Sequence, residues 1–192
     1  MGSVDRLPEE TSIDDLVVRR WTVDDLEALH AAIGENVEHL RPRMPWIAEE
    51  PKPLAGRRAL VQGWSDAWAN GGDVVMGIWR EGAVVGATGL HHRGWPDGPE
   101  IGFWVDHRHL GQGIATRSSR ALTDLALTLA GVDAVYLTHD RTNLASRRVP
   151  EKLGYTWLGE AAVTDPSKVA PADDGVLGRW RMARADWPPA AP

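Results

Sequence analysis

Hydrophobic and polar residues alternate in two patterns along the chain. Short apolar runs predict strands, and apolar positions at helical spacing predict amphipathic helices. Short apolar runs rich in β-branched residues predict strands at 16–20, 74–80, 84–91, 100–106, 132–138, 155–163 and 176–185. Apolar positions three and four residues apart predict helices between Thr22 and Pro42 and at 57–69, 114–129 and 143–153. Strands and helices in this order indicate one α/β or α+β domain.

The segment from Val105 to Thr116 carries most of the chemistry. It leaves a predicted strand, turns through Gly111 and Gly113, and enters an amphipathic helix. Glycines let the backbone approach a ligand closely, and the free N–H groups at a helix N-terminus attract anions. Arg108 would add a full positive charge. The turn therefore favours a phosphate site, although an ordinary strand-to-helix turn beside a basic residue remains the alternative.

The sequence of this turn matches neither of two common nucleotide-binding motifs. A Walker loop needs a lysine after its last glycine, whereas Ile114 follows Gly113. A dinucleotide fingerprint needs a third glycine after the first strand of a βαβ unit. Thr116 occupies that place, and the turn lies in the middle of the chain.

Composition narrows the class of protein. The chain has 192 residues, a net charge of −6 and no cysteine. The charge argues against a nucleic-acid partner, and the missing cysteines exclude disulfides, thiolate zinc sites and a cysteine nucleophile. No apolar run nears the ~20 residues of a membrane span, and the acidic N-terminus lacks a signal pattern. We therefore expect a cytoplasmic protein with no membrane partner.

The domain boundaries follow from the same pass along the chain. Residues 1–13 are expected to form a flexible arm, 14–187 a single domain, and 188–192 a disordered tail. Ten tryptophans stand against two tyrosines and one phenylalanine. They serve either as large core residues or, in part, as walls of a pocket for an apolar group.

Three segments carry a family resemblance. EIGFWVDHRHLGQGIAT contains the spelling R/Q-x-x-G-x-G/A, NLASRRVPEKLGY follows it, and HLRPRMPW precedes it. Together they resemble the GNAT superfamily of N-acetyltransferases, in particular its RimJ/RimL-type subgroup. The resemblance implies an α+β fold (an α/β sandwich): a twisted mixed sheet of about seven strands with about four helices. Its splayed central strands would be 100–106 and 132–140, with acyl-CoA between them.

The resemblance also implies acetyl-CoA as the acyl-donor co-substrate, without a metal. The backbone of Trp104 and Val105 would meet the thioester and pantetheine, the glycine turn would hold the pyrophosphate, and Asn143 would cap a short helix and contact pantetheine. The implied cofactor-binding residues are Trp104, Val105, Arg108, Leu110, Gly111, Gln112, Gly113, Ile114, Ala115, Thr116, Asn143 and Ser146. Four histidines, at 91, 92, 107 and 109, lack a metal-ligand spacing and are interpreted as surface residues.

Three residues are candidates for catalysis by this resemblance. Glu100 occupies the place of a general base, and Ser146 that of the group that serves the leaving thiolate. His139, at a predicted strand end, would relay protons. The alternatives are a polar residue at a strand start, an ordinary serine in a first helical turn, and a hydrogen-bonded histidine. Pro150 stands where many members have a tyrosine acid, and it cannot donate a proton.

The activity implied is transfer of an acetyl group from acetyl-CoA to a primary amine. The acceptor would be a protein or peptide N-terminus or a small-molecule amine, and the protein a monomer or homodimer. A succinyl or other acyl donor stays open, and the alternative function is a degenerate CoA-binding sensor or partner module. The acceptor pocket is expected from 38–50, 91–99 and 164–174, with Trp46 as a wall and Trp64 and Trp68 as further candidates.

Overall fold

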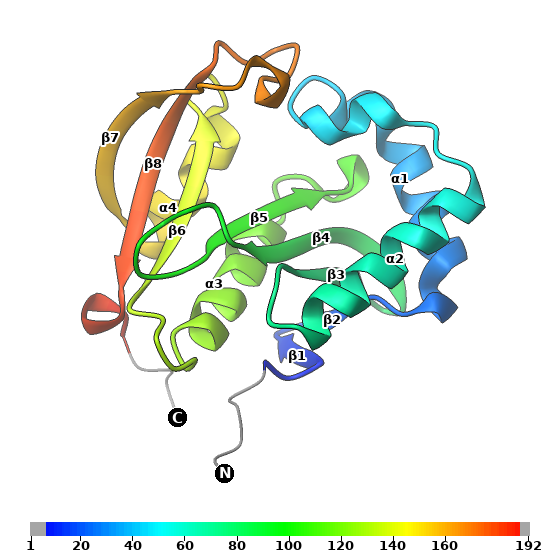
Figure 1. The fold of residues 1–192 in the computed structure, drawn as a ribbon, viewed down its shortest axis with the longest axis horizontal. Helices are drawn as coiled ribbons and strands as arrows, with labels where there is room; N and C mark the ends of the chain where they lie inside the picture. Colours follow the sequence, from blue (N-terminus) through cyan, green and yellow to red (C-terminus); the bar gives the residue numbers. More distant parts are fainter. Residues whose placement is uncertain (1–6, 189–192) are drawn as a thin grey trace.

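The computed structural model describes residues 7–188, which form one eight-stranded sheet flanked by helices (Figure 1). The strands are β1 Glu10–Ile13, β2 Leu16–Arg20, β3 Val74–Arg80, β4 Ala83–His91, β5 Glu100–Val105, β6 Ala134–Asp140, β7 Thr156–Ala162 and β8 Val176–Ala183. The α-helices are α1 Leu26–Leu40, α2 Leu54–Ala69, α3 Ile114–Ala126 and α4 Leu144–Leu153. Short 3₁₀ turns, among them Pro45–Glu49 and His107–His109, connect them.

The sheet opens in its middle. Its strand order is β1-β2-β3-β4-β5-β6-β8-β7, and every neighbouring pair is antiparallel except β5 and β6. These two parallel strands are in register only at Glu100↔Tyr136 and Ile101↔Leu137, whereas β5 pairs with β4 along its whole length. Beyond Ile101 the two strands diverge (Figure 1). The predicted splay between them is confirmed.

Each face of the sheet has its own apolar core because side chains alternate along a strand. Trp104 of β5 packs into a cluster with residues of α1 and α2, among them Leu29 and Val61. Ile101 of the same strand belongs to the cluster on the opposite face, which includes Leu122 of α3 and Val149 of α4. The helices therefore cover the sheet in two pairs, one on each face.

The structure corrects the predicted N-terminal boundary of the domain. Residues 10–13, expected in a flexible arm, form the edge strand β1 in antiparallel register with β2, and the sheet has eight strands instead of about seven. This strand, ETSI, is short and half exposed, so it carries no apolar run that a pattern could show. Residues 1–6 and 189–192 of the expected arm and tail lie outside the described residues.

The remaining elements differ from expectation mainly at their ends. The second helix begins at Leu54 instead of residue 57, and α3 ends at Ala126 instead of residue 129. Pro150 lies inside α4, as the sequence requires. Within residues 7–188, no helix is long and apolar enough to cross a membrane.

Candidate active site

Two cavities of about 410 Å³ each meet at the splay of the sheet. The first, the glycine-turn cavity, is lined by the turn before α3 and by α4. The second, the α2 cavity, is lined by residues of α1, α2, β4 and β5. Met44, Phe103 and Trp104 line both. A group bound in one cavity can therefore react with a group bound in the other at this junction.

The divergence of β5 from β6 leaves one edge of β5 without a strand partner. From Gly102 to Val105 the backbone pairs with β4 only. Such an unpaired edge can hydrogen-bond an extended ligand in the manner of an added strand. This free edge lies along the glycine-turn cavity, since Phe103, Trp104 and Val105 all line that cavity.

The glycine turn has the backbone conformation that an anion site needs. Gly111 and Gly113 have φ angles of 74° and 75°, in the left-handed region that glycine adopts without strain. A Cβ added at either position would have no atom within 4 Å, so both glycines face open space. Gly113 is the N-cap of α3, whose first N–H groups carry the positive end of the helix dipole.

Ten of the twelve predicted cofactor residues line the glycine-turn cavity. They come from β5, from the turn and from α4, and they are Trp104, Val105, Leu110, Gly111, Gly113, Ile114, Ala115, Thr116, Asn143 and Ser146. The structure thus brings together segments that lie some forty residues apart in the chain.

Arg108 and Gln112 do not line this cavity. The Arg108 guanidinium donates to Asp106 Oδ1 at 3.0 Å and Oδ2 at 2.7 Å, and it pairs with Glu35. The hydrogen bonds that Arg108 donates to Asp106 raise the pKa of the Arg108 guanidinium. The side chain of Gln112 instead accepts a hydrogen bond from Arg80 at 2.6 Å. In this structure the Arg108 guanidinium is bound within the turn, so a contact between its charge and a phosphate stays a prediction.

Other cations line the glycine-turn cavity and were not expected from the sequence. Arg43 after α1, and Arg148 and Lys152 on α4, contribute to its wall. Among the described residues no aspartate or glutamate does so, although the chain as a whole carries a charge of −6. The spacing of residues 148 and 152, one helical turn, was the available signal. The cavity is thus electropositive, as a polyanionic ligand requires.

The first turn of α4 places two predicted residues on the wall of the glycine-turn cavity. Asn143 caps the helix, since its Oδ1 accepts a hydrogen bond from the backbone N–H of Ser146 at 3.1 Å. The hydroxyl of Ser146 has no hydrogen-bond partner within residues 7–188. It is therefore free to donate to a group bound in the cavity.

Glu100 lies across the junction, on the wall of the α2 cavity. Its Oε2 accepts a hydrogen bond from Trp95 Nε1 at 2.8 Å, and its Oε1 accepts one from Thr138 Oγ1 at 2.9 Å. The carboxylate is half-buried at the first residue of β5. A carboxylate on one cavity and a hydroxyl on the other are groups that could transfer protons at the two ends of one reaction.

His139 does not join the other candidates. It is buried on the α3–α4 face, and it lines neither cavity. Its Nδ1 contacts the Asp140 carbonyl at 2.8 Å, and its Nε2 accepts from Trp180 Nε1 at 3.0 Å. Both ring nitrogens are therefore occupied, with the proton on Nδ1. The hydrogen-bonded alternative fits this geometry, and the proton relay does not.

The four histidines considered as metal ligands lie near aspartates, and two of the three tryptophans considered for the acceptor pocket line the α2 cavity. His91 and His92 contact Asp73, and His107 and His109 lie near Asp106. Within the described range no group of three such residues could hold a metal ion. Trp46 and Trp64 line the α2 cavity, but Trp68 packs against the opposite core beneath Arg20.

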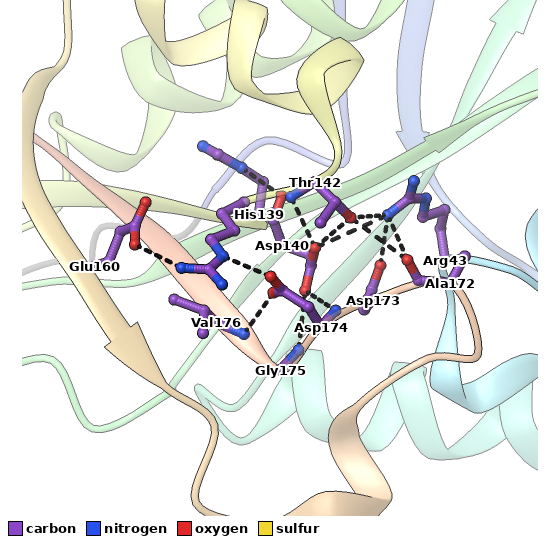
Figure 2. A network of polar contacts seen from close by, with 11 residues as sticks. Arg43, His139, Asp140, Thr142, Glu160, Ala172, Asp173, Asp174, Gly175 and Val176 are labelled. Atoms are coloured by element: carbon purple, nitrogen blue, oxygen red, sulfur yellow. Dashed lines mark hydrogen bonds and ion pairs between the residues drawn. The ribbon is translucent and has the colours of Figure 1, made fainter.

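A second buried aspartate organises the far side of the opening. Asp140, at the end of β6, accepts hydrogen bonds from Thr142 N and Oγ1 and from the backbone of Asp174 and Gly175 (Figure 2). Burial alone would raise the pKa of Asp140, but these hydrogen bonds hold it below its usual value. Arg43 joins the network by donating to Thr142 Oγ1 at 2.6 Å and Asp173 Oδ1 at 2.8 Å.

Comparison with known proteins identifies the family. Residues 15–156 match the model of the acetyltransferase (GNAT) domain. A Bacillus subtilis (strain 168) protein named "Putative ribosomal N-acetyltransferase YdaF" is 26% identical over 150 residues, 77% of this chain and 81% of that protein. The match to the domain model covers well over half of the chain, which therefore belongs to the GNAT family and is an acetyl-CoA-dependent N-acetyltransferase.

Solved structures share the fold. The RimL ribosomal L7/L12 alpha-N-protein acetyltransferase in complex with coenzyme A is 20% identical, with a TM-score of 0.79 over 92% of this chain and 97% of that one. The microcin C7 self-immunity acetyltransferase MccE, in complex with acetyl-CoA and AMP, is 14% identical, with a TM-score of 0.81 over 94% and 99%.

Proposed function

We propose that this N-acetyltransferase acetylates the N-terminal amine of a protein or peptide, with acetyl-CoA in the glycine-turn cavity and the amine in the α2 cavity. The observation that carries the proposal is the junction of the two cavities at Met44, Phe103 and Trp104. One cavity is cationic and ends in a glycine turn, and the other is walled by tryptophans and carries a carboxylate. Each suits one of two substrates.

The residues of the glycine-turn cavity fit acetyl-CoA. Its phosphates would meet the N–H groups of the turn and the cations Arg148 and Lys152, while pantetheine would follow the unpaired edge of β5. Acetyl-CoA supplies a thioester carbonyl that an amine can attack. Asn143, besides capping α4, has its amide nitrogen available for this ligand.

Two side chains of this chain would move protons. Glu100 accepts the proton that the attacking amine loses, from its place on the α2 cavity. The Ser146 hydroxyl donates a hydrogen bond to the leaving thiolate, which then takes a proton from water. This role is open to Ser146 because its hydroxyl has no other partner in the described residues. Pro150 offers no proton, so Ser146 and water are the donors at this end.

The acceptor is proposed from the α2 cavity and from the relatives. Trp46 and Trp64 give it apolar walls. Glu49 and Glu50 on its wall pair with Lys52 and Arg57, which leaves Glu100 as the carboxylate that can face an amine. A cationic amine on an apolar or extended chain matches such a wall. The ribosomal acetyltransferases named above support a protein N-terminus, and a small-molecule amine is the competing acceptor.

A panel of acceptors tests the proposal. Thiol release from acetyl-CoA is measured with peptides that differ only in their first residue, with the same peptides blocked at the N-terminus, and with small amines. We expect turnover only with free N-termini, and mass spectrometry should locate the acetyl group on the α-amine. Faster turnover of small amines would overturn the acceptor, and CoA binding without any transfer would favour a binding module.

The proton-transfer roles are tested with two variants and the fastest peptide of that panel. Glu100→Gln and Ser146→Ala should each lower kcat by ~10²-fold or more, because each removes a positioned acid or base. The affinity for CoA should stay close to that of the wild type in both. Near wild-type rates in both variants would mean that water carries the protons.

A further inference from the structure

Behind Glu100 lie two side chains that line neither cavity but hold its carboxylate. Trp95 Nε1 donates to Oε2, and Thr138 Oγ1 donates to Oε1. One donor per oxygen fixes the carboxylate plane and still leaves a lone pair on each oxygen. Neither residue belongs to the lining of the α2 cavity, so a bound acceptor meets Glu100 and not its partners.

Trp95 is itself held in place by β6. Its ring stacks on Tyr136, with ring centroids 4.1 Å apart and planes 4° apart. The Tyr136 hydroxyl donates to Asp97, and Arg181 Nη2 donates to the other oxygen of Asp97 at 2.6 Å. Tyr136 is also the strand partner of Glu100. The loop 92–99 is therefore fastened to the sheet at the residue beside the carboxylate.

We propose that Trp95 and Thr138 are positioning residues that hold the Glu100 carboxylate toward the acceptor amine, an inference that rests on the proposed role of Glu100 as the base. A glutamate has three rotatable bonds and would otherwise sample several positions at the splay. The two donors differ in kind. An indole N–H can only donate, so Oε2 stays an acceptor, whereas the Thr138 hydroxyl can turn. When the amine proton reaches Oε1, the hydroxyl of Thr138 rotates from donor to acceptor.

The hydrogen bond is tested without any acceptor. In the ¹⁵N–¹H spectrum of tryptophan-labelled protein, Trp95→Phe assigns the indole signal of Trp95. Glu100→Gln should then move that signal and leave the indole signal of Trp187, which donates to Asp124 of α3, unchanged. An unmoved Trp95 signal would overturn the proposal.

The positioning role is tested by kinetics with the fastest peptide of the acceptor panel. Trp95→Phe keeps an aromatic ring on Tyr136 but deletes the donor, and we expect kcat to fall about tenfold, the scale of one hydrogen bond to a charged group, with the KM for acetyl-CoA unchanged. Thr138→Val should act similarly, and Thr138→Ser, which keeps the hydroxyl, should restore the rate. Trp187→Phe, which deletes a matched indole–carboxylate bond elsewhere, should stay within about twofold of wild type.

A double-mutant comparison separates this inference from the proposed function. If Trp95 acts through Glu100, Trp95→Phe costs less than about twofold once Glu100→Gln is present. Losses that multiply would mean that Trp95 acts elsewhere, which would overturn the positioning role. A Glu100→Gln enzyme with the wild-type rate would overturn the base assignment and the positioning role with it, while the indole signal still reports the bond.

Discussion

The two strands that open the sheet end in buried aspartates with different sets of partners. Asp106 follows β5 and is held by Arg108, two residues away, and by Asn36 of α1 at 3.0 Å. Asp140 ends β6 and is held by Thr142 and by the backbone at residues 174 and 175, more than thirty residues away in the chain (Figure 2). The Asp106 carboxylate takes most of its hydrogen bonds from its own turn, whereas the Asp140 carboxylate divides them between its own turn and a distant loop.

The difference indicates that the two sides of the opening have different structural roles. The Asp106 side presents a preformed turn, because the backbone N–H of Arg108 and its guanidinium both bind one carboxylate. The Asp140 side ties the cap of α4 to the β7–β8 loop and, through Arg43, to the end of α1. Since Asn36 and Arg43 both belong to α1 or its end, this helix contacts both sides of the opening.

The largest effect should come from Asp106→Ala. This side chain is fully buried. Its removal deletes one of the two acceptors of the Asn36 amide nitrogen, which keeps only Ala32 O, and it leaves the turn without the carboxylate that binds Arg108. We expect a loss of about 3 kcal/mol in the free energy of unfolding, measured in urea, because a buried charge with several donors disappears. CoA affinity, measured by calorimetry, should also fall because the glycine turn loses its support.

The control for this variant is Asp133→Ala, which removes an exposed aspartate beside β6. It should change the free energy of unfolding by less than about 0.5 kcal/mol. If the two variants lower the free energy of unfolding equally, Asp106 does not stabilise the turn as proposed.

The sequence predicts the Asp106 side of the opening better than the Asp140 side. The glycine turn is contiguous, so its strand, glycines and helix are visible as a pattern, and most of its residues line the cavity. For Arg108, the sequence shows a positive charge but not the Asp106 carboxylate that binds the guanidinium in the folded chain. The Asp140 network joins residues 43, 140, 142 and 173–175, and only the folded sheet brings these together.

His139 and Trp95 illustrate the same limit. A strand pattern tells which residues share a face, but whether His139 faces a cavity or the Trp180 indole depends on how β8 packs beside β6. The contact of Trp95 with Glu100 likewise depends on a loop whose path is set by the stack on Tyr136. Side-chain partners across a loop or a strand leave no periodic signal.

A smaller effect is expected for Asp140→Asn, about 1–2 kcal/mol in the free energy of unfolding, because its backbone partners at 174 and 175 lie in a loop that water can reach. This variant also tests the pH dependence. Hydrogen bonds hold the folded pKa of Asp140 below the usual 3.8, so its stabilisation is present above that value and is lost as the pH falls through the folded pKa. Urea unfolding between about pH 5 and pH 3 should therefore show a shallower loss of stability in Asp140→Asn than in the wild type. An identical slope in both proteins would assign the acid sensitivity elsewhere, with Asp106 the first candidate.

The smallest effect on stability should come from Arg43→Ala, and it bears most directly on the link between the two strand ends. A single nitrogen, Nη1, reaches Thr142, Ala172 and Asp173, and the side chain is about one-third exposed. Partly solvated ion pairs contribute little, so we expect a loss of no more than about 1 kcal/mol. The backbone bond from Ala172 N to Pro42 O, at 2.9 Å, keeps the two segments together in the variant. Arg43 also lines the glycine-turn cavity, so its loss should speed CoA dissociation, measured by stopped-flow displacement, by more than the stability change accounts for. Arg43→Lys keeps the positive charge, so its rate of CoA dissociation should lie between those of the wild type and Arg43→Ala. If Arg43→Ala destabilises the protein as much as Asp106→Ala does, the Asp140 side is as central to the fold as the turn, and the division between the two strand ends fails.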